Sequence, residues 1–493
     1  MSPLAPNRLA PSLARRATAV AALLSLSACA VGPNYHRPAL SPAAGVGAAA
    51  EQPQLVAGMD LPEAWWSVFR SADLDALVAQ ALKNNPTIEA AQAALRSARE
   101  QVRAQRGAYF PTVGVSLQPS RQSIAPNLSS PLENNADIYN LSTTQLSISY
   151  VPDLFGANRR AVESLVAQQD QQRFELEAAR LTLASNVVLA AIQDALLRAQ
   201  IEDTQAIVAD QRQTLASFQR QYQLGQASQA DLAAQQALLA QSEASLPPLE
   251  KQFRVNQDLL ASLVGRTPAQ PVEVHFGFKA LTLPDRLPLS LPAQIVEHRP
   301  DVRIAEAQLH AASAEIGVAE AARWPNLNIG VAAGSAALAL TPSFNKAADF
   351  WSVAATLTQP VFDGGTLLHR ERAAKAVYDQ AAAQYQGTVV GAFQNTADVL
   401  HALATDADAE RAAEASEAAS TRSLDIAKRQ FGLGDLSRLA VLSAEQTEAQ
   451  AQLALLQARA NRYDDVVALF QALGGGWWNR GAGPGGAKTA GGD

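Results

Sequence analysis

Hydrophobic and polar residues follow two different periods along this chain. In four short stretches, around positions 113–117, 146–150, 327–331 and 351–357, apolar residues alternate with small or polar ones. Strict alternation of this kind is typical of a β-strand with one apolar face. The rest of the body places apolar residues at helical spacing in long stretches rich in Ala, Gln and Leu. We therefore expect four strands among several long helices.

The four strands are expected as two hairpins, at about 111–152 and 325–361, with long polar loops from Pro119 to Asn140 and from Gly334 to Asp349. Aromatic residues flank these strands: Tyr109, Phe110, Tyr139, Tyr150, Trp324, Phe350 and Trp351. Alternating strands with aromatic ends and long loops are typical of a transmembrane β-barrel. A soluble sheet with one solvated face would show the same alternation, so the strands alone leave both interpretations open.

A very long helix is expected after each hairpin. The stretch from Ala157 to Arg220 has no Gly or Pro, and at 1.5 Å per residue its helix would be roughly 95 Å long. The stretch from Thr366 to Gln430 has two Gly and no Pro. Helices of this length fit the staves of a long cylinder. We expect return helices that run to about Pro247-Pro248 in one case and to Leu473 in the other.

A short motif stands at the end of each long helix. Tyr222-Gln-Leu-Gly-Gln-Ala-Ser228 and Phe431-Gly-Leu-Gly-Asp-Leu-Ser437 both place Gly three residues and Ser six residues after an aromatic. Gly can close a helix in the left-handed conformation, and Ser can cap the next helix through its hydroxyl. Each motif therefore predicts a tight turn between antiparallel helices, with tips near residues 225 and 434.

The two motifs belong to an internal duplication. Equivalent prolines lie 214 residues apart and equivalent glycines 209 apart: Pro86 and Pro300, Pro111 and Pro325, Gly156 and Gly365, Gly225 and Gly434, Gly265 and Gly474. Constant offsets over such a length indicate two similar halves with one small change of length between them. We assign repeat 1 to 73–265, repeat 2 to 300–475 and a Pro-rich linker to 266–299.

The N-terminus has the pattern of a lipoprotein signal peptide, assigned to 1–28. Arg8, Arg15 and Arg16 precede an apolar stretch and the sequence Leu26-Ser27-Ala28-Cys29. Cys29 is the single cysteine, so it forms no internal disulfide, and we expect it to carry lipid; an idle small residue in a generic signal is the alternative. Residues 29–72 would be an extended tether with little core of its own, and 476–493 a flexible tail.

Composition and motifs exclude several classes of function. The net charge of −7 and the pI near 5.5 disfavour a nucleic-acid partner. The body has no run of 18 or more apolar residues, which predicts no spanning helix. The six histidines show no metal-ligand spacing, and no phosphate-binding or nucleophile motif is found. We therefore expect no enzyme activity, no metal and no cofactor.

Four strands are too few to close a barrel, for which about eight are needed. One copy in a membrane would leave two sheet edges in lipid, where each unpaired backbone group costs several kcal/mol. Oligomerisation resolves this problem, and three copies would supply twelve strands.

The chain resembles the outer membrane factor (TolC-like) family, and within it the NodT-type outer membrane lipoproteins of RND efflux systems. The resemblance rests on the lipobox, the two Gly-Ser turns and four further motifs in this order: Val31-Gly-Pro-Asn-Tyr35, Trp65-Trp66, Asp153-Leu-Phe-Gly156 and Gln359-Pro-Val-Phe-Asp-Gly-Gly365. It implies an α+β membrane protein that forms a homotrimer, with a 12-stranded outer-membrane barrel and a periplasmic α-barrel. It also implies a periplasmic adaptor and an inner-membrane RND transporter as partners.

The resemblance assigns roles at the two turns. Residues implied in adaptor docking are Tyr222, Leu224, Gly225, Ser228, Phe431, Leu433, Gly434 and Ser437, although turn chemistry alone explains the same glycines. Family members narrow the entrance with acidic residues just beyond the second turn, where this chain has Ala440 and Ser443 instead. The remaining gate candidates are Asp231, Asp435, Arg220, Arg429 and Arg438; the alternative for these is a capping Asp and ordinary surface arginines.

The function expected is a passive exit channel of a tripartite efflux pump. Two alternatives stay open on the sequence: the outer-membrane duct of a type I secretion system, and a non-conducting elongated periplasmic scaffold.

Overall fold

The computed structural model describes residues 30–38, 55–57, 59, 61–125, 127, 136–273, 276–284, 286–289, 297–338 and 348–480. The chain forms two compact units. One comprises Met1–Arg37, Arg96–Gln171 and Ala305–Tyr385, and the other comprises Pro38–Leu95, Gln172–Ile304 and Gln386–Asp493. Cys29, the predicted signal peptide before it and the tail beyond Arg480 lie outside the described residues.

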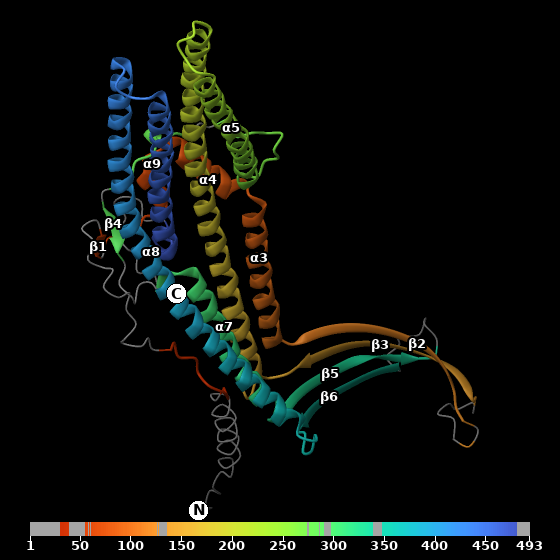
Figure 1. Cartoon of the computed structure of the whole chain (residues 1–493). Coiled ribbons are helices and arrows are strands. Elements are labelled where there is room, and N and C mark those ends of the chain that lie inside the picture. The colour runs from red at the N-terminus through yellow and green to blue at the C-terminus, as the bar shows by residue number, and fades with distance from the viewer. Residues whose placement is uncertain are drawn as a thin grey trace, which may run out of the picture. The chain divides into compact units, whose positions relative to one another are not determined.

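Long helices and four long strands dominate the chain (Figure 1). The helices are α2 (Ala72–Asn84), α3 (Pro86–Arg106), α4 (Ala157–Gln223), α5 (Gln229–Leu263), α7 (Pro300–Ala321), α8 (Thr366–Leu433) and α9 (Arg438–Ala472). The strands are β1 (Leu55–Ala57), β2 (Thr112–Ser123), β3 (Ile138–Tyr150), β4 (Leu287–Leu289), β5 (Asn326–Ala337) and β6 (Asp349–Thr358). The two long helices, of 67 and 68 residues, begin and end within three residues of the expected limits.

The backbone repeats what the glycine and proline offsets indicated. Pro86 and Pro300 are the first residues of α3 and α7, a position where the missing N–H of proline costs nothing. All six glycines of the three equivalent pairs have φ between 72° and 93°, which other residues rarely adopt: Gly156, Gly225, Gly265, Gly365, Gly434 and Gly474. The duplication is therefore a duplication of backbone conformation.

The four long strands form one antiparallel sheet in the order β2-β3-β5-β6. In the first hairpin Thr112 pairs with Ser149, and in the second Asn326 pairs with Thr358. These two pairs coincide when the offsets of 214 and 209 are applied, so both hairpins have the same register. Both strands of the first hairpin extend further than expected, to Ser123 and from Ile138, so the predicted loop from Pro119 to Asn140 was too long.

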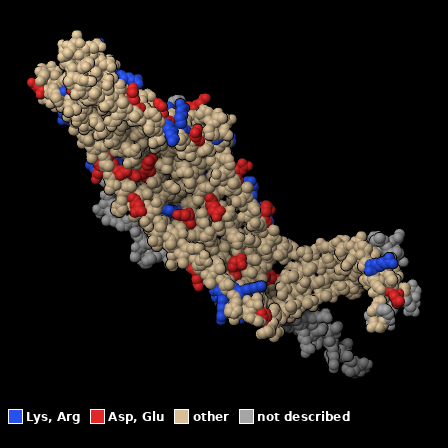
Figure 2. Space-filling model, turned by 45° about the vertical axis from the view of Figure 1, so that its right-hand side comes forward, with Lys and Arg blue, Asp and Glu red and all other residues tan. Residues whose placement is uncertain are grey.

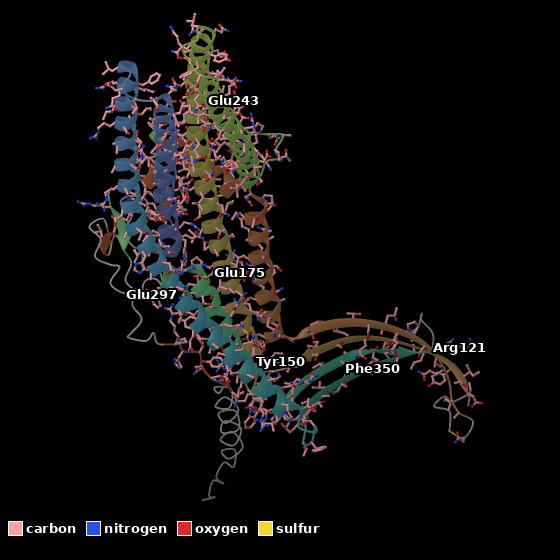
Figure 3. The ribbon with its side chains drawn as sticks, in the orientation of Figure 1. Arg121, Tyr150, Glu175, Glu243, Glu297 and Phe350 are labelled. Atoms are coloured by element: carbon pink, nitrogen blue, oxygen red, sulfur yellow. The ribbon has the colours of Figure 1, made fainter. Side chains whose placement is uncertain are left out.

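One face of this sheet is apolar and exposed. Val113, Val115, Trp351 and Val353 are among the exposed large apolar residues of the strands, and they alternate with small or polar residues. Only Arg121 and Asp349 are charged in the four strands, and the sheet is almost free of charge in Figure 2. Tyr150 and Arg121 lie at opposite ends of the sheet (Figure 3). A lipid-facing surface needs these properties.

The segment after Cys29 is bound more firmly than the tether interpretation suggested. The guanidinium of Arg160 on α4 donates to the carbonyls of Val31 and Gly32 and to the side chain of Asn34. The ring of Tyr35 stacks on His310 of α7, with centroids 4.3 Å apart. These first residues therefore pack on the core of their unit. Further along the predicted tether, Trp65 and Phe69 are fully buried, which corrects the expectation that 29–72 contributes little to a core.

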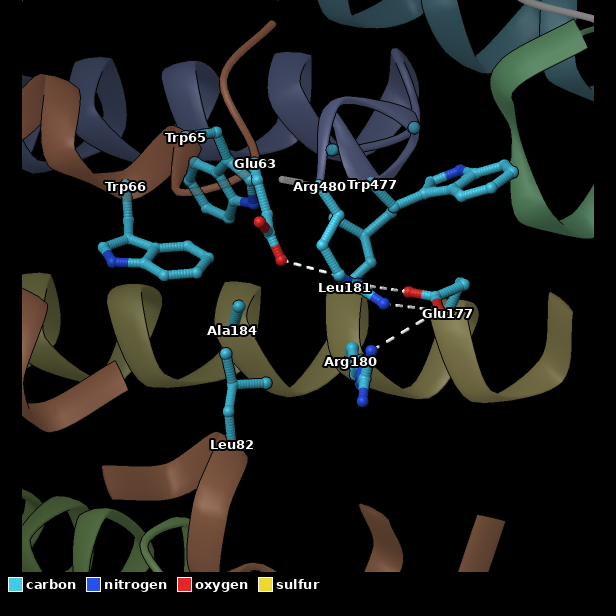
Figure 4. A pocket seen from close by; sticks show the side chains of 12 residues that line it. Glu63, Trp65, Trp66, Leu82, Glu177, Arg180, Leu181, Ala184, Trp477 and Arg480 are labelled. Carbon is cyan, nitrogen blue, oxygen red and sulfur yellow. Dashed lines mark hydrogen bonds and ion pairs between the residues drawn. The ribbon is translucent and has the colours of Figure 1, made fainter. Parts of the chain in front are cut away.

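In the other unit, the linker and the tail also contribute structure. Strand β1 pairs in parallel with β4 of the linker. The sequence did not predict this contact, because strands of three residues are too short to show an alternating pattern. Arg480 lies between the carboxylates of Glu63 and Glu177, at 2.6 Å from each, beside a cavity of about 280 Å³ lined by Trp65 and Trp477 (Figure 4). The first residues of the predicted tail are thus packed, which corrects the assignment of 476–480 as flexible.

One further expectation was wrong, and another needs comment. Helix α5 does not end at Pro247-Pro248 but continues to Leu263. Both prolines are exposed, so water can reach the carbonyls whose helical hydrogen bonds they remove. The sequence predicted no membrane-spanning helix. One 18-residue stretch of α4 is apolar enough to span a membrane by composition alone, but 67% of that stretch is buried in the protein. The burial identifies it as part of a core helix.

Candidate functional site

The two helical hairpins end in turns with the same hydrogen bonds. In the first, Gly225 N donates to Tyr222 O and Gln226 N donates to Gln221 O; in the second, Gly434 N donates to Phe431 O and Asp435 N to Gln430 O. This pair of bonds satisfies the last carbonyls of the long helix and requires a residue of positive φ, here the glycine. The local sequence therefore fixes both turns.

Serine caps the return helix in both hairpins, but the caps differ. Ser228 Oγ accepts from Asp231 N at 3.1 Å, and the Asp231 carboxylate accepts in return from the Ser228 backbone N–H and hydroxyl. Ser437 Oγ accepts from Ala440 N at 3.4 Å, with no carboxylate to complete a reciprocal cap. Asp231 is thus engaged in a capping box, the structural role that was the alternative to a gate.

The turns present apolar side chains to solvent. Leu224 is 72% exposed and Leu433, its equivalent in the second half, is 78% exposed. Tyr222 is also exposed, whereas its equivalent Phe431 packs on the small core of Leu424, Ala427 and Val441 between α8 and α9. Each turn thus exposes one leucine at an equivalent position, and a binding partner can cover such apolar surface.

Arg438, the first residue of α9, connects the second hairpin to the first. Its guanidinium carbon lies 4.7 Å from the ring centroid of Phe218 on α4, and Nη2 lies 3.4 Å from Gln235 Oε1 on α5. Nη2 is also 3.6 Å from Glu445 Oε2 on α9, and both side chains are close to 90% buried. We call Arg438, Glu445, Phe218 and Gln235 the Arg438 cluster.

Glu445 is the partner that sequence reasoning missed. The pKa of its carboxyl group is raised overall. Burial is the main cause, and the negative charge of Asp210 adds to it, while the positive charges of Arg438 and Lys428 partly offset the rise. Lys428 Nζ lies 3.9 Å from Glu445 Oε1. Glu445 lies seven residues beyond Arg438, two helical turns on the same face, so helical periodicity could have suggested the pair.

The other gate candidates are not brought together within one chain. Within the described part of the chain, the hydrogen bond of Arg220 goes to Ser217 of its own helix, and Asp435 and Arg429 are exposed. Among the described residues, Arg438 alone of the three arginines contacts a different helix.

Comparison with known proteins agrees with this architecture. The family model for outer membrane efflux proteins matches residues 77–266 and 291–475. The pyoverdine export outer membrane protein OpmQ of Pseudomonas putida is 30% identical over 459 residues, covering 92% of this chain and 96% of the relative. Nodulation protein T of Rhizobium leguminosarum is 28% identical over 474 residues, covering 94% of each. The solved structure of the outer-membrane channel OprN matches with a TM-score of 0.84 at 26% identity, covering 91% of this chain and all of that one.

The matched segments carry the two hairpins and both Gly-Ser turns, and the fold agrees over 91% of this chain. This chain belongs to the outer membrane efflux protein family and is an outer-membrane channel of the efflux-pump type, with a helical periplasmic extension.

Proposed function

We propose that three copies of this chain form a passive exit duct, in which their sheets close a 12-stranded barrel and their helices a periplasmic tunnel. The observation that carries the proposal is the open four-stranded sheet with an exposed apolar face, on which the two charged residues, Arg121 and Asp349, lie near the loop ends of β2 and β6. Its edge strands β2 and β6 would leave unpaired backbone groups in lipid, and further copies can pair them. As a channel, the chain is not an enzyme, and the energy for transport comes from partner proteins.

The substrates proposed are small organic compounds delivered from the periplasm by a tripartite pump with an RND transporter. OpmQ, which covers nearly the whole of this chain, is named for the export of pyoverdine. Cys29 would carry the lipid that adds a second membrane attachment to the barrel.

Native mass spectrometry and planar-bilayer recording test the duct together. We expect a mass of three chains and a stable ion conductance from the same preparation. A monodisperse monomer without conductance would contradict the proposal.

The leucine pair at the turns is proposed as the docking site of the adaptor. Leu224→Asp combined with Leu433→Asp replaces the two exposed apolar side chains with charges. Surface plasmon resonance should then detect no binding of the adaptor from the same pump. Val255→Asp is the matched control, since Val255 is 59% exposed but lies on α5 far along the helix from the turn. Equal loss in the control, or none in the double variant, would argue against docking at the turns.

The Arg438 cluster is proposed as the latch that holds the second hairpin against the first when the tunnel is closed. It connects α9 to α4 and α5 through one side chain. Loss of this connection frees the second hairpin to move, which is the motion an adaptor would have to promote.

A further inference from the structure

The structure contains one example of how the two hairpins meet edge to edge. Strand β3 closes the first hairpin and pairs with β5, which opens the second, with Ile148 opposite Val331. In the duplication β6 corresponds to β3 and β2 corresponds to β5. The contact between β3 and β5 is therefore a template for a contact between β6 of one copy and β2 of the next.

We propose that β6 and β2 of neighbouring copies pair in the register that this template dictates, with Leu357 opposite Leu117. The inference rests on the proposed function, since it requires a closed ring of copies. Adding 209 to Ile148 gives Leu357, and subtracting 214 from Val331 gives Leu117. The internal registers of the two hairpins are related by these same offsets. We therefore apply the offsets to the contact between β6 of one copy and β2 of the next.

The side chains at the two edges agree with this register. Leu357 is 64% exposed and Leu117 is 59% exposed, and both project from the apolar face of the sheet. A slip by one residue would place Leu117 opposite a residue of the other face, because the period of a strand is two. A slip by two would keep the faces, so the register must be tested at that level.

An aromatic pair supports the same seam at the end where the strands meet the helices. Within the chain, Phe155 after β3 stacks on Trp324 before β5, with centroids 5.2 Å apart. The equivalent of Trp324 on the free edge is Phe110, and the other edge carries Phe362 after β6; both rings are exposed. Phe362 stands two residues earlier than Phe155 would predict, so its ring approaches Phe110 of the next copy from a shifted position.

Disulfide cross-linking between copies tests the register. Leu117 and Leu357 of one chain are separated by three strand spacings of about 4.8 Å, too far for a disulfide, so any cross-link joins two copies. With Leu117→Cys and Leu357→Cys in the full-length protein, oxidation by copper phenanthroline should give covalent dimers and trimers on non-reducing gels. The parent, in which Cys29 is the only cysteine, should give none.

Two matched variants calibrate the result. Val115→Cys with Leu357→Cys displaces one partner by two residues, to a diagonal of roughly 7–8 Å that is not readily bridged, and should cross-link at least several-fold less. Ile148→Cys with Val331→Cys should form a disulfide within one chain, detected by mass spectrometry as a linked pair of peptides of monomeric size.

The outcomes separate this inference from the proposed function. Two results in a conducting trimer would overturn the register and leave the duct intact. One is better cross-linking with Val115→Cys than with Leu117→Cys. The other is cross-linking with neither of these, while the control pair Ile148→Cys and Val331→Cys does react. A monomer that does not conduct overturns both. As a second readout, Phe362→Ala should lower the temperature at which the trimer dissociates; an unchanged temperature would remove the aromatic contact from the seam.

Discussion

The two halves of this protein share a backbone and differ in the side chains that act on it. Their return helices α5 and α9 are both 35 residues long, and their strand hairpins have one register. Both turns use the same Gly and Ser positions. The residues common to the halves are those that fix the path of the chain, so backbone geometry is what the duplication has retained.

The hairpin ends show what has diverged. At the start of the return helix the first half has Gln229 and Asp231, and the second half has Arg438 and Ala440 at the equivalent positions. The first tip satisfies its polar groups locally, through the capping box. At the second tip, the buried guanidinium of Arg438 instead contacts the first hairpin. Equivalent substitutions in the two halves should therefore have unequal effects.

The largest difference is expected at the first position of the return helix. Arg438→Ala leaves the buried carboxyl of Glu445 without its nearest cation, which should destabilise the tip by roughly 3 kcal/mol. We expect a several-fold higher conductance in planar bilayers and faster hydrogen exchange at the start of α9. Gln229→Ala is the control in the first half and should change neither. Equal effects of the two substitutions, or none from Arg438→Ala, would mean that the cluster does not hold the closed state.

Local rules were sufficient to predict most of the fold. The alternation around Val113 and Leu357, the Gly-Ser turns and the glycine offsets all depend on neighbours in sequence, and the structure confirmed the strands, the turns and the long helices. The prediction failed where solvent or distant chain segments decide. Helix α5 tolerates Pro247-Pro248 because they are exposed, and a helical pattern does not report which side water reaches.

The site was less predictable than the fold. Arg438 was selected because of its place near the turn, but its partners Phe218 and Gln235 are on α4 and α5, more than 200 residues away in sequence. Contacts at such separation depend on how two hairpins pack, which periodicity within one helix does not specify. Glu445 is the exception, because its spacing from Arg438 on one helix face could have been read directly.

A second difference lies deeper in the return helices, where Asn256 of the first half corresponds to Asp465 of the second. Asn256 is buried and donates to Ala190 O at 2.9 Å. Asp465 has one buried carboxylate oxygen without a hydrogen-bond partner among the described residues. Burial first, and then the negative charge of Asp406, raise the pKa of Asp465 to about 7, although Arg462 lowers it. Burial likewise raises the pKa of its neighbour Asp464 to about 7.

These raised pKa values fix the sign of a pH effect. Between pH 4 and pH 7 the folded chain holds protons on Asp464 and Asp465 that the unfolded chain has lost, so the free energy of unfolding should fall as the pH rises. Asp465→Asn should therefore stabilise the protein by about 1–2 kcal/mol at pH 8, a value reduced for the water that reaches the group, and change little at pH 4. Thermal unfolding at both pH values measures this.

The reciprocal exchange sharpens the comparison. Asn256→Asp should destabilise the first half at pH 8 and make its unfolding pH-dependent, because a carboxylate cannot donate to Ala190 O. If Asp465→Asn lowers stability at pH 8, the carboxylate has a cationic partner in the assembled protein, and the two halves differ for a reason that lies between copies.

The smallest expected difference concerns the serine caps. Ser228→Ala and Ser437→Ala should each destabilise a return helix by about 1 kcal/mol, since each removes the acceptor of an N-terminal N–H. Ser228→Ala should cost more, because the Asp231 carboxylate also loses the hydroxyl that donates to it at 2.6 Å. Hydrogen exchange in the first turns of α5 and α9 resolves the two effects. A larger effect at Ser437 would show that its cap also supports the Arg438 cluster, because Arg438 is the next residue. The cap of the second hairpin would then be coupled to the contact between the two hairpins, and the cap of the first would not.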